Sequence, residues 1–130
     1  MKRGALKRRP RARIAPDERE RRRHWRLAVL RASNGQCVMC ADQPLGPAER
    51  QGREDLLRRI EAHHVIAQQH LKQRGLDPWN PILGIAACAW HHGQHTSRRQ
   101  RIPLRLVPQH TQATARALGL MWLLEREHPA

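Results

Sequence analysis

Phenylalanine and tyrosine are absent from this chain of 130 residues, in which four tryptophans are the only large aromatic side chains. Three cysteines are too few for a paired disulfide framework, so we expect reduced thiols. No run of 18 or more apolar residues occurs, which excludes a transmembrane helix. The basic N-terminus lacks the apolar stretch of a secretory signal. These absences predict one modest cytoplasmic domain.

Acidic residues are also scarce: 11 Asp and Glu stand against 25 Lys and Arg, a formal net charge of +14. Residues 1–31 alone hold 13 of the basic side chains and three acidic ones. This excess favours a polyanionic partner, nucleic acid before an anionic membrane. Leu6 and Ile14 are the only large apolar residues in 1–15 besides Met1, too few for an interfacial helix.

The first 16 residues are expected to form a disordered basic arm. Such an arm binds a phosphate backbone without reading sequence, and salt weakens it steeply. A solubilising tail is the alternative. The arginines expected to contact the backbone from this arm are Arg8, Arg9, Arg11 and Arg13.

The sequence predicts a helix at each end of the chain and shorter elements between them. Pro16 followed by acidic residues starts a helix, and Asn34-Gly35 ends it. The last helix follows Pro108, and Gly119 is expected to kink or split it. Its expected apolar face consists of Ala113, Ala117, Leu120 and Leu124. The other expected elements are a loop over 41–53, strands within 56–66 and 82–87, short helices over 68–74 and 88–95, and a basic segment over 98–105.

Two ligand pairs have the spacing of a zinc site. Cys37 and Cys40 form a CxxC turn, and Cys88 and His91 form a CxxH turn about fifty residues later. A tetrahedral zinc ion needs four nitrogen or sulfur ligands, and a spacing of two residues lets one turn supply a pair. The alternative is that the three cysteines are small buried core residues.

Five histidines in two groups accompany these turns. His63 and His64 end a strand, where neighbouring side chains point to opposite faces and take different roles. His92 and His95 lie one helical turn apart, so their rings can converge. Phosphodiester hydrolysis needs a base to activate water and a cation to bind the phosphate, and imidazoles can serve both needs. The alternative is that these histidines serve only structure.

These motifs together resemble one family. Cys37-x₂-Cys40, Glu61-x-His63-His64 and Cys88-x₂-His91-His92-x₂-His95 resemble the zinc-knuckle branch of the HNH endonucleases, also called ββα-metal or His-Me finger nucleases. The Glu-x-His-His element is also similar to colicin-type DNases. The segment after His95 resembles the tail of small HNH proteins of bacteriophages and prophages. The resemblance covers roughly residues 20–105.

The resemblance implies a small α+β fold and a set of roles. His64 would be the general base, and Glu61 would orient a catalytic histidine. A catalytic divalent cation (Mg²⁺, Mn²⁺, Ni²⁺ or Zn²⁺) would bind His63, His92 and His95, with a phosphate contact as an alternative role for His95. Products of the family carry 3′-hydroxyl and 5′-phosphate ends. The ligands of a structural zinc ion would be Cys37, Cys40, Cys88 and His91.

Two positions depart from the family pattern. Relatives usually carry cysteine where this chain has His91, so either His91 or His92 completes the zinc site; we favour His91. Asn80 lies 12 residues before His92, farther than the middle asparagine of relatives. Either the turn brings Asn80 into place, or a backbone carbonyl or Glu61 orients the base.

The sequence thus predicts an arm over 1–16, an HNH module over 17–107 and a C-terminal helix over 108–130 that packs on the module. The expected activity is cleavage of DNA, as a nick or a double-strand break, in the cytoplasm of a bacterial host. The alternatives are a non-catalytic zinc-stabilised DNA-binding protein and an interaction subunit beside a phage terminase large subunit or portal. We expect a monomer or weak dimer. Further DNA contacts are expected from Arg98, Arg99 and Arg101.

Overall fold

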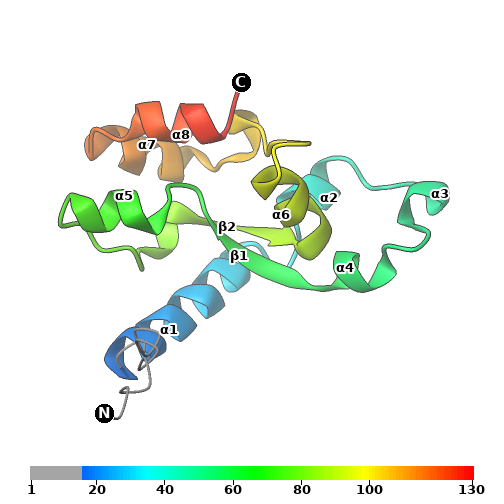
Figure 1. The fold of residues 1–130 in the computed structure, drawn as a ribbon, viewed down its shortest axis with the longest axis horizontal. Coiled ribbons are helices and arrows are strands. Elements are labelled where there is room, and N and C mark those ends of the chain that lie inside the picture. Colours follow the sequence, from blue (N-terminus) through cyan, green and yellow to red (C-terminus); the bar gives the residue numbers. More distant parts are fainter. Residues whose placement is uncertain (1–15) are drawn as a thin grey trace, which may run out of the picture.

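The computed structural model describes residues 16–130, so the arm and the four arginines predicted to bind DNA from it lie outside the described residues. The described part is an α+β fold with a two-stranded antiparallel sheet (Figure 1). No helix within this part is both long enough and apolar enough to cross a membrane. In chain order, the elements are α1 (Pro16–Ala32), α2 (Val38–Asp42), α3 (Pro47–Arg50), α4 (Glu54–Arg58), β1 (Ile60–His64), α5 (Gln68–Gln73), η1 (Pro81–Leu83), β2 (Gly84–Cys88), α6 (Ala89–Thr96), η2 (Leu104–Leu106), α7 (Gln109–Ala117) and α8 (Met121–Glu127).

The two strands place the residues of the candidate site. β1 and β2 pair so that Ile60 lies opposite Cys88 and His64 lies opposite Gly84. The connection between them carries α5 and η1, and α6 begins directly after β2. The elements therefore run strand, strand, helix, with the cysteine pair entering from α2. The second strand begins at Gly84, two residues later than expected, because Pro81 and Ile82 lie in the 3₁₀ turn η1.

Helix α1 has the predicted bounds and packs on one side of the sheet. Asp17 and Glu18 lie in its first turn, and Asn34 and Gly35 after its end have φ of 54° and 68°. Trp25 and Val29 are buried one helical turn apart and form a core cluster with Trp79. The apolar stripe of α1 is thus what holds this largely charged helix against the strands.

The larger core lies on the other side, where Figure 1 shows α7 and α8 opposite α1. The expected final helix is two helices, because Gly119 at φ 72° breaks the chain between α7 and α8. Leu120 and Leu124 are buried as expected. Ala113 and Ala117 are exposed, and Thr111 and Ala115 face the core instead. The break changes the helical phase, so a face extrapolated across Gly119 was wrong for α7.

The segment between α2 and β1 is less irregular than expected. The predicted loop over 41–53 contains the short helix α3, which begins with Pro47, and α4 precedes β1. Leu57 of α4 is buried in the larger core. This segment projects away from the strands in Figure 1.

Candidate functional site

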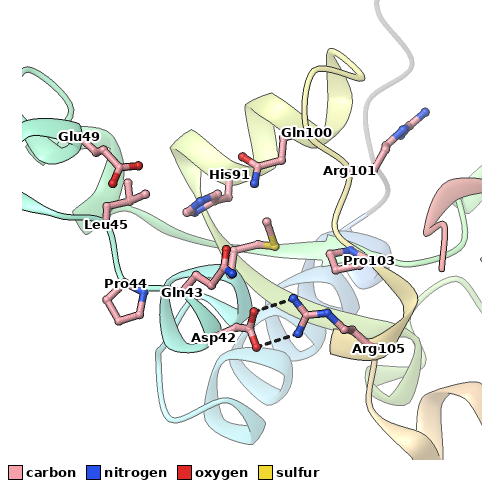
Figure 2. A pocket seen from close by; sticks show the side chains of 11 residues that line it. Asp42, Gln43, Pro44, Leu45, Glu49, His91, Gln100, Arg101, Pro103 and Arg105 are labelled. Atoms are coloured by element: carbon pink, nitrogen blue, oxygen red, sulfur yellow. Dashed lines mark hydrogen bonds and ion pairs between the residues drawn. The ribbon is translucent and has the colours of Figure 1, made fainter.

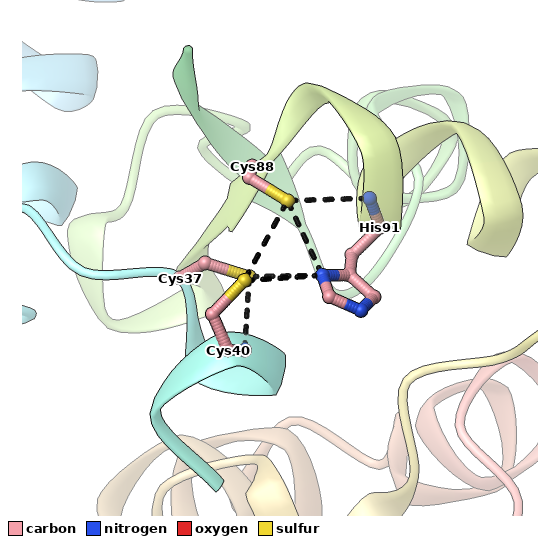
Figure 3. A group of neighbouring side chains, drawn as sticks. All are labelled: Cys37, Cys40, Cys88 and His91. Carbon is pink, nitrogen blue, oxygen red and sulfur yellow. Dashed lines mark hydrogen bonds between the residues drawn. The ribbon is translucent and has the colours of Figure 1, made fainter. Parts of the chain in front are cut away.

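Cys37, Cys40, Cys88 and His91 lie together as predicted from their spacing (Figure 3). Nδ1 of His91 lies 3.2 Å from Sγ of Cys88, 3.4 Å from Sγ of Cys40 and 3.6 Å from Sγ of Cys37. Sγ of Cys40 and Sγ of Cys88 are 3.9 Å apart. The donor-to-donor edges of a tetrahedral zinc site with two or three sulfurs are roughly 3.5–3.8 Å. This Cys₃His cluster can therefore hold a metal ion such as zinc, with His91 as its nitrogen ligand.

Both halves of the Cys₃His cluster sit at helix starts. Cys37 is the N-cap of α2 and Cys88 is the N-cap of α6. The backbone N–H groups of Cys40 and His91 donate to Sγ of Cys37 and Cys88, over 3.5 Å and 3.4 Å respectively. Backbone N–H donors at a helix start stabilise a thiolate. The two tight turns thus favour the thiolate form of Cys37 and Cys88, which is the form that binds a cation.

The three thiols cannot all ionise easily without a positive charge among them. Hydrogen bonds from Cys88 and His91 lower the pKa of Cys37 to about 3. The bond to Cys37 raises the pKa of Cys88, and burial raises the pKa of Cys40. One thiolate is therefore stabilised at the expense of the others. A bound divalent cation would remove this conflict, because coordination deprotonates thiols outright.

A hollow beside the Cys₃His cluster has a volume of about 440 Å³ (Figure 2). Arg105 makes two hydrogen bonds of 2.8 Å to the carboxylate of Asp42 across it. This pair joins the basic segment after α6 to the end of α2. The charges of Asp42 and Arg105 are thus paired with each other at the end of α2, close to the turn that carries Cys37 and Cys40.

A separate cleft of about 450 Å³ lies at the edge of β1. Strand alternation directs His63 toward α6 and His64 toward α1, as predicted. We call the cleft at the edge of β1 the histidine cleft, since three imidazoles border it. Its lining residues are Arg22, Trp25 and Arg26 of α1, Glu61, Ala62, His63 and His64 of β1, Gln68 of α5 and His92 of α6.

His64 is held in one orientation. Its ring stacks on Trp25 with centroids 3.9 Å apart, and Nε2 lies 2.8 Å from the carbonyl oxygen of Pro78. A carbonyl can only accept, so Nε2 carries the proton and Nδ1 keeps its lone pair. Burial lowers the pKa of His64, and the charges of Arg22 and Lys72 lower it further. The ring is therefore neutral at neutral pH with a basic Nδ1.

Asn80 makes its contacts with η1 and α1. Oδ1 of Asn80 accepts from the N–H of Ile82 and caps η1, and its carbonyl accepts from the indole of Trp25. The group bonded to His64 is the carbonyl of Pro78. Of the groups that the sequence analysis considered beside His64, the structure thus has a backbone carbonyl there.

Glu61 contacts His92 and not His64. Nδ1 of His92 donates to Oε1 of Glu61 over 3.1 Å, which leaves Nε2 of His92 with a lone pair. The rings of His63 and His92 have centroids 5.0 Å apart. A carboxylate that fixes the tautomer of a histidine in this way is common behind metal ligands. Glu61 thus orients the ring of His92 beside that of His63.

His95 lies deeper, and the structure groups it with a residue that the sequence analysis did not single out. His63, His95 and His128 each offer a ring nitrogen within 4.8 Å of the others, and all three are buried. Burial lowers the pKa of His63 well below its usual range and that of His95 to about 4. All three rings are thus neutral. Nothing in the local sequence around His128, two residues from the C-terminal Ala130, indicated this position.

The predicted basic contacts differ among themselves. Arg98 and Arg99 are exposed after α6. Arg101 instead binds Glu127 over 3.2 Å and the carbonyl of His95 over 3.1 Å, so its charge is used within the fold. Arg22 and Arg26 line the histidine cleft, although the sequence analysis counted them only as part of a basic helix. Their spacing of four residues around Trp25 was the available signal.

Comparisons with protein-family models, with curated proteins and with solved structures find no match for this chain.

Proposed function

We propose that this protein is a metal-dependent HNH endonuclease that hydrolyses DNA phosphodiester bonds. The observation that carries the proposal is the state of His64. Its Nε2 is bonded to the carbonyl of Pro78, and His64 lines a cleft bordered by two further histidines and two arginines. A neutral imidazole fixed in this way suits a general base near neutral pH.

The order of elements supports the same class. Two antiparallel strands followed directly by α6 match the ββα-metal arrangement that the sequence resembles. In this proposal the Cys₃His cluster holds a structural zinc ion that seats the start of α6. His92, the residue after His91, then reaches the histidine cleft. The zinc knuckle therefore positions one wall of the active site.

In the proposed reaction, Nδ1 of His64 takes a proton from a water molecule whose oxygen forms the new bond to phosphorus. The bond from phosphorus to the 3′ oxygen breaks, and that oxygen takes a proton from a solvent water molecule, which gives 3′-hydroxyl and 5′-phosphate ends; His64 returns its proton to solvent. The carbonyl of Pro78 stays bonded to Nε2–H and stabilises the imidazolium that forms. A divalent cation (Mg²⁺, Mn²⁺, Ni²⁺ or Zn²⁺) would supply charge stabilisation for the phosphate and the leaving oxygen. His63 and His92 would hold it, with His95 behind them.

Basic residues supply the docking surface. Arg22 and Arg26 lie in the cleft, where they can bind the phosphates beside the scissile one. The exposed Arg98 and Arg99 and the arginines of the arm extend this surface in the proposal. Because these contacts go to phosphates, they add affinity without sequence preference.

The setting we propose is DNA processing or packaging by a bacteriophage, in the cytoplasm of the host. A terminase large subunit or portal protein is the proposed partner. The protein would act there as a monomer or weak dimer. These proposals follow from the resemblance of the segment after His95 to small phage HNH proteins.

The deciding experiment is cleavage of supercoiled plasmid by zinc-loaded protein with added Mg²⁺, Mn²⁺ or Ni²⁺. We expect His64→Ala to lower the rate by about 10²–10⁴-fold, because the general base is lost. DNA binding, measured by fluorescence anisotropy, should stay unchanged. His24→Ala is the matched control, since His24 is an exposed histidine on α1 outside the cleft.

Each other outcome points elsewhere. Salt-sensitive DNA binding without cleavage by the wild type would favour the non-catalytic DNA-binding protein. Equal cleavage by the wild type and His64→Ala would show that His64 is not the base.

A further inference from the structure

The turn after α6 holds an arginine in an unusual backbone conformation. Arg98 has a φ of 62°, in the left-handed region, where the Cβ atom of an L-residue lies too close to the backbone. Among residues 16–130, the other positions with a positive φ are four glycines and Asn34, which are the residue types that tolerate this region best. Arg98 is thus the one long side chain that the described part of the chain places there.

The turn needs this backbone conformation but not an arginine. The N–H groups of Arg99 and Gln100 both donate to the carbonyl of Gln94, over 3.0 Å and 3.1 Å. The N–H of Arg98 donates to the carbonyl of His95 over 3.1 Å. Helix ends closed in this way usually carry glycine at the left-handed position. Since glycine would make the same backbone bonds at lower steric cost, the side chain of Arg98 needs another explanation, and residues in strained conformations cluster at functional sites.

Arg98 lies beside the candidate active site. It lines a hollow of about 220 Å³, which we call the side hollow. His63 and His64 line the side hollow and also the histidine cleft. The two hollows therefore meet at the end of β1, where the proposed general base lies.

The charge of Arg98 is not used within the described fold. Arg101 and Glu127 also line the side hollow, but they are paired with each other over 3.2 Å. Arg98 is exposed and has no acidic side chain within ion-pair distance among residues 16–130. Its guanidinium is thus available to an anionic ligand. Because Arg22 and Arg26 line the histidine cleft, cations are present in both hollows that meet at the end of β1.

We propose that Arg98 binds a phosphate of the DNA strand in the side hollow, on the opposite side of the scissile phosphate from Arg22 and Arg26. The strand then crosses the end of β1. The inference rests on the proposed function, since it needs DNA at the histidine cleft. A guanidinium forms paired hydrogen bonds to phosphate oxygens, which glycine cannot form. Arg98 therefore serves DNA binding at the expense of the stability of the turn.

Arg98→Gly separates these two effects. Its melting temperature should rise by about 2–5 °C, because glycine adopts the left-handed conformation with little strain. Its affinity for a DNA duplex should fall about tenfold, because a charge-assisted phosphate contact is lost. The log–log slope of the salt dependence should fall by about 0.9. Thermal unfolding and fluorescence anisotropy, both on zinc-loaded protein without a catalytic cation, provide the measurements.

Three further variants are the controls. Arg98→Lys keeps both the charge and the strain, so its salt slope and melting temperature should stay close to those of the wild type. Asn34→Gly makes the same kind of backbone change after α1, outside both hollows, and should leave DNA binding unchanged. Arg116→Ala removes an exposed charge on α7, also outside both hollows, and should keep the salt slope.

The other outcomes are distinct. An Arg98→Gly protein that binds DNA as tightly as the wild type, or that is less stable, would overturn the inference and leave the nuclease proposal intact. Equal losses of slope in Arg98→Gly and Arg116→Ala would also overturn it, since any surface charge would then act alike. Weaker DNA binding by Arg98→Gly, with no cleavage by the wild type, would support the phosphate site and count against the nuclease. A wild type that binds no DNA would overturn both proposals.

Nitrogen-15 NMR of the arginine side chains tests the contact directly in the unaltered protein. The Nε–H signal of Arg98, identified by its absence from the spectrum of Arg98→Lys, should shift when a DNA duplex is added without a catalytic cation. The signal of Arg116 should stay in place. An Arg98 signal that does not shift in the DNA complex would overturn the inference.

Discussion

The Cys₃His cluster and the histidine cleft use neighbouring residues for different tasks. His91 and His92 are consecutive on α6, yet His91 is buried among three sulfurs and His92 faces Glu61. One residue of helix turns the side chain by about 100°, which is enough to separate the two sites. His63 and His64 both line the histidine cleft, but strand alternation gives them different contacts, with His92 and with Trp25 respectively.

The two sites also differ in closure. The Cys₃His cluster brings four donors together, three of them on buried residues, and four nitrogen and sulfur donors are typical of a structural site. The histidine cleft opens to solvent and combines imidazoles with cationic side chains, which is typical of a site that admits a substrate. One small hairpin and the helix after it thus carry both a closed group of possible metal ligands and an open cleft.

The largest effect is expected when one ligand is removed from each site, which tests whether only the Cys₃His cluster stabilises the fold. Cys88→Ser should release zinc and unfold the protein, because structural zinc contributes about 10–16 kcal/mol in small zinc domains. His92→Ala should keep zinc and the fold, and it should lower the affinity of the histidine cleft for the proposed cation. Metal content and thermal unfolding of both variants provide the measurement. A folded, zinc-free Cys88→Ser protein would contradict the structural role.

Gly84→Ala tests how α1 forms one wall of the cleft. A Cβ at Gly84 would lie 2.5 Å from Cγ2 of Val29 and 2.9 Å from Cζ2 of Trp25, so α1 would have to shift. We expect a loss of about 1–3 kcal/mol in the free energy of unfolding, from overpacking. Gly93→Ala is the control, because a Cβ there meets nothing within 4 Å. Chemical denaturation measures both, and equal stability of the two variants would count against the close packing of α1.

The smallest effect is expected from the arginines of the cleft. Arg22→Ala and Arg26→Ala should each lower the steepness of the salt dependence of DNA binding by about 0.9 in log–log slope, if each side chain binds one phosphate. Arg116→Ala is the control, since Arg116 is exposed on α7 outside the cleft. Anisotropy at increasing NaCl concentrations gives the slopes. An unchanged slope in both cleft variants would place DNA elsewhere.

Local signals predicted the elements around the site well. The bounds of α1 followed from Pro16, the acids after it and Asn34-Gly35, and all three act within a few residues of the helix ends. The Cys₃His cluster followed from ligand spacing, because each tight turn fixes the distance between its own two donors. The opposite directions of His63 and His64 followed from the period of a strand.

What sequence alone could not supply depends on contacts between distant segments. His128 reaches His63 only because α8 packs back over the core, and no local pattern encodes that return. The carbonyl beside His64 belongs to Pro78, and carbonyls carry no residue-specific signal. The exposed Ala113 shows the related limit that a helical face cannot be continued across a break whose geometry is unknown.

The adjacency of His91 and His92 has a consequence for which length changes the chain can tolerate. Residues 47–52 are exposed and should gain or lose residues with little disturbance to either site. One residue inserted between Cys88 and His91 would rotate every later histidine of α6 by about 100° and misdirect the donors of both sites together. This stretch should therefore tolerate substitutions between the ligands more readily than any change of its length.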